Sequence, residues 1–84
     1  MNGRHRKTLL AIFREPVSGS IVWSDVESLL IAIGCTVVEG SGSRVRFEKD
    51  GLLALFHRPH PEKEAKRYQV RDARRFLEML GILP

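Results

Sequence analysis

The feature that most constrains the fold of this chain is a short turn between two strand-like segments. The turn contains Asp50 and Gly51, two residue types that tolerate the positive φ angles of a tight hairpin. Residues 44–48 before it alternate charged and apolar side chains, and the segment after it is mostly apolar. The pattern predicts an antiparallel hairpin in which, counting outward from the turn, Arg44 lies opposite His57.

Two helices are predicted before this hairpin. Apolar residues at helical spacing indicate a first helix over residues 4–14, and Pro16 ends it. Ser24 and Glu27 have the spacing of a capping box, in which each side chain satisfies a backbone donor of the first turn. They predict the start of a second helix, which Gly34 ends.

The predicted fold class is α+β. Residues 35–39 are β-branched and apolar, and predict a strand ahead of the hairpin. Apolar residues from Ala73 to Leu80 mark a final helix, which Gly81 stops. The expected architecture is the α-β-β-β-α order of double-stranded-RNA-binding domains, with a three-stranded antiparallel sheet and an extra N-terminal helix. Helices packed on one face of the sheet would leave its other face to Arg44 and Arg46.

The length of 84 residues predicts a single domain over residues 1–84. One cysteine, Cys35, excludes an internal disulfide and fits a reducing cytoplasm, where a buried apolar role is expected for it. The apolar stretch from Leu9 to Phe13 is too short for a signal-peptide core or a membrane span. We therefore expect a cytoplasmic protein without a membrane association.

The net charge of +4 conceals a segregation of charge along the chain. Residues 15–40 carry four acidic residues and no basic one, whereas residues 43–75 carry ten lysines and arginines against five acidic residues. A basic surface attracts polyanions through counterion release, so the second block favours RNA as a partner. A merely solvated basic face is the alternative. The acidic block predicts a second surface of opposite sign, through which copies of the chain could pair head to tail.

Several local features together resemble a known family. They are Leu29-Leu30 with Gly34, the Gly42-Ser43 corner, the run from Pro59 to Glu64, and the run from Phe76 to Gly81. In their order and spacing, residues 24–81 resemble the core of a HicA-type toxin, an mRNA interferase of toxin–antitoxin systems, and residues 4–14 add a helix. The resemblance implies a small enzyme that cleaves mRNA without a metal or cofactor and is neutralised by a HicB-like antitoxin.

The sequence departs from this family at one position. The family usually has its catalytic histidine directly after the Gly-Ser corner, where this chain has Arg44. His57 is predicted to lie opposite that position on the neighbouring strand, and can supply an imidazole to the same site. Two functional classes follow: a ribonuclease toxin that works through His57, and a non-catalytic RNA-binding module of the same fold.

RNA cleavage without a metal needs a base for the 2′-hydroxyl, an acid for the leaving oxygen and cations for the charged phosphorane. His57 fits the base or acid role because an imidazole titrates near neutral pH. His60, held between two prolines, is the second candidate catalytic residue. A half-buried strand-end histidine and a merely exposed loop histidine are the respective alternatives.

Five basic residues are the candidate RNA ligands. Arg44 and Arg46 share one strand face about 7 Å apart, which approximates the spacing of successive phosphates. Ion pairs of these two arginines with Glu48 or another neighbour are the alternative. The other three candidates follow the strand in a basic cluster: Arg58, Lys63 and Lys66. The sequence has no clustered Cys and His ligands and no phosphate-cradling glycine loop, so neither a metal nor a nucleotide cofactor is expected.

Overall fold

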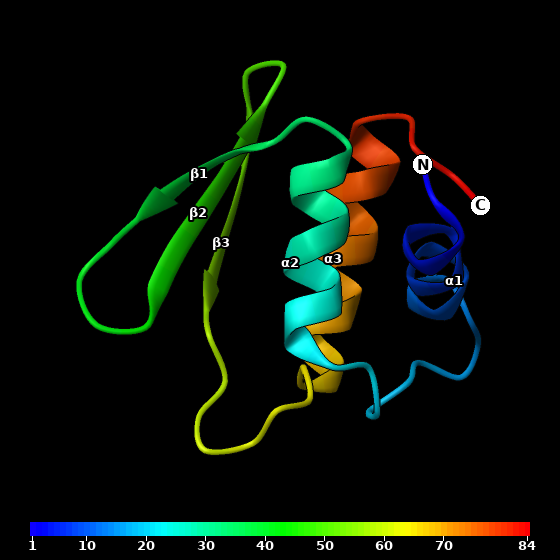
Figure 1. Ribbon diagram of the computed structural model, residues 1–84, viewed down its shortest axis with the longest axis horizontal. Coiled ribbons are helices and arrows are strands. Elements are labelled where there is room, and N and C mark those ends of the chain that lie inside the picture. Colours follow the sequence, from blue (N-terminus) through cyan, green and yellow to red (C-terminus); the bar gives the residue numbers. More distant parts are fainter.

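The computed structural model describes residues 1–84 as three layers (Figure 1). A three-stranded antiparallel sheet forms one outer layer, two helices cover one of its faces, and a third helix packs on the far side of these two. In chain order the elements are α1 (Gly3–Ile12), α2 (Trp23–Ala32), β1 (Thr36–Glu39), β2 (Arg44–Lys49), β3 (Leu52–His57) and α3 (Arg67–Met79). The predicted α+β class and order of elements are confirmed.

The hairpin has the predicted turn and register. Asp50 and Gly51 both have positive φ angles, 52° and 78°, as a two-residue turn matched to the twist of the strands requires. Lys49 pairs with Leu52, and this register continues outward to the pair of Arg44 and His57. Strand β1 pairs with the other edge of β2, so the order in the sheet is β1-β2-β3 and both β1 and β3 are edge strands.

The alternation of side chains along β2 and β3 separates a buried face from an exposed one. Val45, Phe47 and Phe56 turn toward the helices and are almost fully buried. The rings of Phe47 and Phe56 form an aromatic cluster with Trp23 of α2, in which the Trp23 and Phe56 centroids are 5.0 Å apart. This packing anchors the residue that directly precedes His57, and so fixes the strand that carries the histidine.

The predicted capping box at the start of α2 is wrong. The helix begins at Trp23, and its N-cap residue Val22 makes no side-chain hydrogen bond. The Glu27 carboxylate instead accepts hydrogen bonds from the Trp23 indole at 2.8 Å and from the Arg58 guanidinium. Charge-assisted bonds are about twice as strong as neutral ones, so the distant arginine draws Glu27 away from the helix terminus.

Helix α1 is part of the hydrophobic core. Leu9 and Ile12 are buried against the layer formed by α2 and α3. Arg74 of α3 ties down the end of α1, because its Nε donates to the Ile12 carbonyl at 3.0 Å and its Nη2 to the Arg14 carbonyl at 2.8 Å. The two chain termini lie near each other on this side of the molecule (Figure 1). None of the three helices has the length and apolar character needed to cross a membrane.

Candidate functional site

A groove of about 400 Å³ lies on the exposed face of the sheet, at the end remote from the hairpin turn. All three strands contribute to it, and the lining includes Val38, Arg44, Arg46, Leu55 and His57. The basic members come from the outward-facing positions of β2 and β3, as the period of two in a strand requires, and Glu39 of β1 also lines the groove. The structure therefore brings three of the seven predicted site residues into one groove.

His57 and Arg44 face each other at the centre of this arrangement. They are register partners at a non-hydrogen-bonded position, where side chains of neighbouring strands approach most closely. His57 is exposed, and its Nδ1 shares a hydrogen bond of 3.3 Å with the Ser43 hydroxyl, while its Nε2 has no partner within the chain. The Arg44 side chain is also exposed and forms no ion pair. A free imidazole nitrogen and a free guanidinium are thus available to one ligand.

The corner before Arg44 depends on glycine. The Gly40 amide donates to the Arg44 carbonyl at 3.0 Å, which brings the two residues together. A Cβ atom at Gly40 would lie only 2.9 Å from the Cβ of Arg44, closer than real side chains approach. Glycine at this position lets the strand begin at Arg44 and turns its side chain into the groove.

A buried glutamine fixes the loop that follows His57. Gln69 of α3 is only 2% exposed, and its Nε2 donates to the His57 carbonyl at 2.7 Å. Its Oε1 accepts from the Lys66 amide at 3.0 Å. One side chain therefore holds both ends of the loop over residues 58–66. The sequence analysis missed Gln69, because a polar residue within a helix pattern gives no signal of a contact with a strand.

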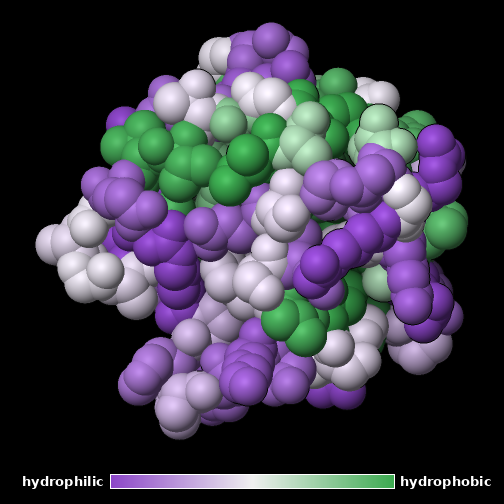
Figure 2. All heavy atoms as spheres, in the orientation of Figure 1, coloured by the Kyte–Doolittle hydropathy of each residue, from purple (hydrophilic) through white to green (hydrophobic).

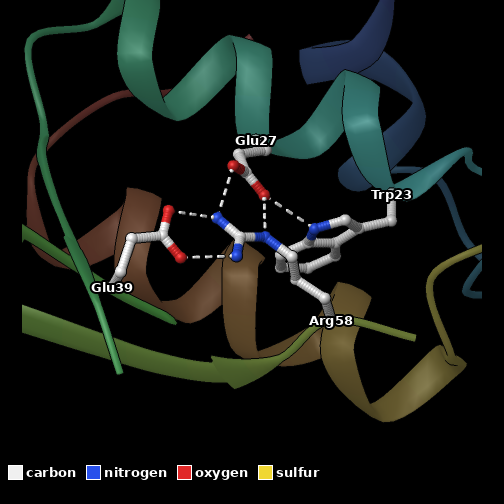
Figure 3. A network of polar contacts seen from close by, with 4 residues as sticks. All are labelled: Trp23, Glu27, Glu39 and Arg58. Carbon is white, nitrogen blue, oxygen red and sulfur yellow. Dashed lines mark hydrogen bonds and ion pairs between the residues drawn. The ribbon is translucent and has the colours of Figure 1, made fainter. Parts of the chain in front are cut away.

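Arg58, predicted as an RNA ligand, lies on the helix side of the sheet within a network of polar contacts (Figure 3). Its guanidinium binds Glu27 of α2 through Nε and Nη2 at 3.0 and 2.9 Å. It also binds Glu39 of β1 through Nη1 and Nη2 at 2.7 and 2.8 Å. The same Glu27 accepts the Trp23 indole hydrogen bond, so the network joins the loop after β3 to the aromatic cluster.

The electrostatics of this network follow from its geometry. The hydrogen bonds from Arg58 hold the pKa of the Glu39 carboxyl below its ordinary value of 4.5. Hydrogen bonds to Glu39 and then to Glu27 raise the pKa of the Arg58 guanidinium, which is charged at any relevant pH. The donors of Arg58 are engaged within the chain, and its side chain is only 30% exposed. We therefore assign Arg58 a structural role in the loop.

The remaining predicted residues lie outside the groove or are paired. Arg46 lines the groove, but its Nε forms an ion pair of 2.5 Å with Glu48, as the alternative interpretation expected. His60, Lys63 and Lys66 are exposed in the loop between β3 and α3, which lies at the bottom of the view where hydrophilic residues dominate the surface (Figure 2). Neither lysine forms an ion pair, so both add free positive charge near the sheet.

The expected acidic surface does not form, because basic residues of the same chain neutralise all four acidic residues of positions 15–40. Asp25 pairs with Arg4 at 3.0 Å, and both Glu27 and Glu39 pair with Arg58. The fourth acidic residue, Glu15, pairs with Arg74. Head-to-tail pairing of copies through an acidic face stays a prediction, although three arginines of the same chain already pair with these four carboxylates.

Fold and site together define a small α+β domain, with three helices on one side of an antiparallel sheet and with a histidine and a free arginine on its open sheet face. The family model of the HicA toxin of bacterial toxin–antitoxin systems matches residues 23–82, and the chain belongs to this family. The protein is thus a toxin of a toxin–antitoxin system, and the family implies an antitoxin partner. No curated protein and no solved structure matches the chain. The match begins at the first residue of α2, so α1 lies outside the family region.

Proposed function

We propose that this toxin is an endoribonuclease that cleaves mRNA without a metal, with His57 as the proton-transfer group and Arg44 as the phosphate ligand. One observation carries the proposal: the free imidazole nitrogen of His57 and the unpaired guanidinium of Arg44 belong to directly opposed residues in one groove. Because the chain belongs to a family of toxins, a site of this kind is expected to carry the toxic activity.

RNA cleavage requires two proton transfers, one from the attacking 2′-hydroxyl and one to the leaving 5′-oxygen. His57 takes the proton from the 2′-hydroxyl, and the resulting oxygen forms a bond to the adjacent phosphorus. The bond from phosphorus to the 5′-oxygen then breaks, and that oxygen takes a proton from the solvent. Arg44 stabilises the additional negative charge of the phosphorane. In the tautomer that this step needs, Nδ1–H donates to the Ser43 hydroxyl, which orients the ring and leaves Nε2 free to accept the proton.

RNA would be held by the basic residues around the groove. Arg44 and Arg46 contact successive phosphates in this proposal, and Arg46 gives up part of its exposed pairing with Glu48, since pairs of this kind contribute little stability. Lys63 and Lys66 extend the positive potential along the loop, and His60 contacts the substrate there. The neutralisation of the acidic block within the chain supports this arrangement, because no internal carboxylate competes for Arg44.

A HicB-like antitoxin would neutralise the toxin by covering the same face. Its carboxylates would lie against Arg44 and the loop lysines, and would compete directly with phosphates. Charge complementarity of this kind raises the association rate more than the final affinity. The association rate of the two proteins should therefore fall as the salt concentration rises.

A non-catalytic RNA-binding module is the second candidate. Two observations favour it: Arg44 occupies the position that usually carries the family's catalytic histidine, and His57 is the only histidine that lines the groove. In that case the toxin would act by occupying RNA rather than by cutting it.

Incubation of the purified chain with a labelled mRNA in the presence of EDTA separates the two candidates. Cleavage by the wild-type chain, reduced by 10²- to 10⁴-fold in His57→Ala with RNA binding kept within a few-fold, is the result expected for a general acid or base. His5→Ala is the matched control, because His5 lies in α1 and does not line the groove, and it should retain most of the activity. Binding without cleavage by the wild-type chain would instead establish the binding module.

A further inference from the structure

The free edge of β3 carries backbone groups that nothing in the chain satisfies. Because Lys49 and Leu52 flank a two-residue turn, they form a hydrogen-bonded pair, and the bonding to β2 alternates from there. Leu53 and Leu55 therefore direct their N–H and C=O groups away from β2, and no hydrogen bond outside the sheet ladder uses them. On the same edge, only the His57 carbonyl is covered, by Gln69.

The side chains along this edge leave it unprotected. Leu53 and Leu55 are 54% and 70% exposed, on the same face as Arg44. Sheet edges are ordinarily protected from pairing by charged residues, prolines, bulges or a covering helix. Five consecutive residues of β3, from Leu52 to Phe56, include no charged residue and no proline, and their register with β2 has no bulge. An exposed apolar edge of this length is a template for a further strand.

A groove of about 180 Å³ runs beside this edge, between β3 and α3. Phe76 and Met79 form part of its apolar lining, and Met79 is 54% exposed. Asp72 and Arg75 line it too, and their charged groups are 4.0 Å apart. The edge is thus bordered by apolar surface and by one charge of each sign.

We propose that a second copy of this chain occupies the edge, so that β3 pairs with β3 of the other copy in antiparallel orientation. The two-fold axis passes beside Ala54, and Leu53 of one copy exchanges both main-chain hydrogen bonds with Leu55 of the other. The leucines of both copies then pack together on the exposed face of a continuous six-stranded sheet.

The distribution of charge selects a second copy as the occupant. The net charge of +4 on each chain opposes self-association in general, so a contact between two copies needs a part of the surface without net charge. The edge of β3 is free of charge, and a two-fold axis allows Asp72 of each copy to approach Arg75 of the other. An RNA strand would find only Arg75 as a cation here, and a strongly acidic partner would meet Asp72.

The dimer leaves Arg44 and His57 accessible, because strand pairing uses the edge of the sheet and these two side chains lie on its face, while Leu55 belongs both to the groove lining and to the interface. Both grooves would then open on the same face of the six-stranded sheet. The proposal does not rest on RNA cleavage, since a non-catalytic chain would have the same edge.

Sedimentation equilibrium of the isolated full chain over about 1 to 500 μM tests the proposal, because this range detects self-association of micromolar strength. The average mass of the wild-type chain should rise to twice the monomer value. Leu55→Lys places a charge at the edge and should stay monomeric throughout. Thr36→Lys is the matched control, because it lies on the same face of the sheet at the opposite edge, and should behave as wild type. A monomeric wild-type chain, or an undiminished dimer in Leu55→Lys, would overturn the proposal.

Cross-linking tests the register. Two Ala54 residues would meet as a non-hydrogen-bonded pair with Cα atoms about 4.5 Å apart, within the range of a disulfide. Ala54→Cys should therefore form a covalent dimer under mild oxidation. Leu53→Cys is the control, because an offset of two residues along the strands together with the spacing between the strands places its two Cα atoms about 8 Å apart, beyond the limit of about 7 Å. Cys35 is buried and common to both variants. Cross-linking of Leu53→Cys but not Ala54→Cys would refute the pairing.

Discussion

Two arginines at the same end of the sheet have opposite environments. Arg44 lies on the open face, exposed and unpaired, whereas Arg58 lies on the helix side and binds two carboxylates. His57 directly precedes Arg58 and shares the open face with Arg44. A single step along the chain therefore separates a group available to a ligand from one engaged in the fold. The position of a basic residue within a basic stretch of the sequence therefore does not show whether its side chain is free to bind a ligand.

The two regions also differ in what holds them. The network of Arg58 links β1, α2 and the loop after β3, and it is connected through Trp23 to the aromatic core. The open face has one long contact, between Ser43 and His57, and one ion pair, between Arg46 and Glu48, whereas Arg44 is free. Rigid support on one side of the sheet thus allows an open, adaptable surface on the other.

The largest expected effect comes from Arg44→Ala on the open face. If the proposed cleavage is correct, loss of the phosphate ligand should lower the cleavage rate by about 10²- to 10³-fold. The slope of the logarithm of the RNA-binding constant against the logarithm of the salt concentration should decrease in magnitude by about one, since one phosphate contact is lost. The free energy of unfolding should stay within about 0.5 kcal/mol of wild type, because the side chain contacts little. Unchanged cleavage and an unchanged slope would remove Arg44 from the site.

Arg58→Ala should have the opposite effects, because it should lower the stability of the fold rather than the cleavage rate. Removal of the guanidinium leaves the half-buried carboxylate of Glu27 without its main donors, which should cost about 2 kcal/mol, between the values for exposed and buried pairs. For a chain of this size, the midpoint of thermal unfolding should fall by about 10 °C. Circular dichroism at pH 7 measures this, with Arg44→Ala as the matched control. Equal midpoints for the two variants would contradict the distinction between the two arginines.

The smallest effect is expected from Glu39→Gln, and it depends on pH. The pKa of Glu39 is lower in the folded chain than its ordinary value of 4.5, so the ionised form stabilises the fold. That contribution is complete above pH 4.5 and is lost as the pH falls through the lower, folded pKa. The variant should therefore melt slightly below wild type at pH 7, and the two should converge in acid. A difference that grows on acidification would show that Glu39 does not act through its charge.

Much of the fold follows from local pattern. The turn at Asp50 and Gly51, together with the alternation in β2, correctly predicted the pairing of Arg44 with His57. Helical spacing correctly located three helices, although Glu27 does not form its predicted capping box. Signals of this kind work because they depend on backbone angles and side-chain periods within a few residues.

What only the tertiary structure decided is which polar groups are used and which remain free. Arg58 meets Glu27 across 31 positions of sequence, and Gln69 meets His57 across 12. The bare edge of β3 likewise depends on where α3 lies beside the sheet. Hydrogen bonds and ion pairs between distant segments form only after the backbone has brought them together, and competition among several possible partners then selects one. Local sequence thus set the faces of the strands, while long-range packing determined that Arg58 is bound and Arg44 is free.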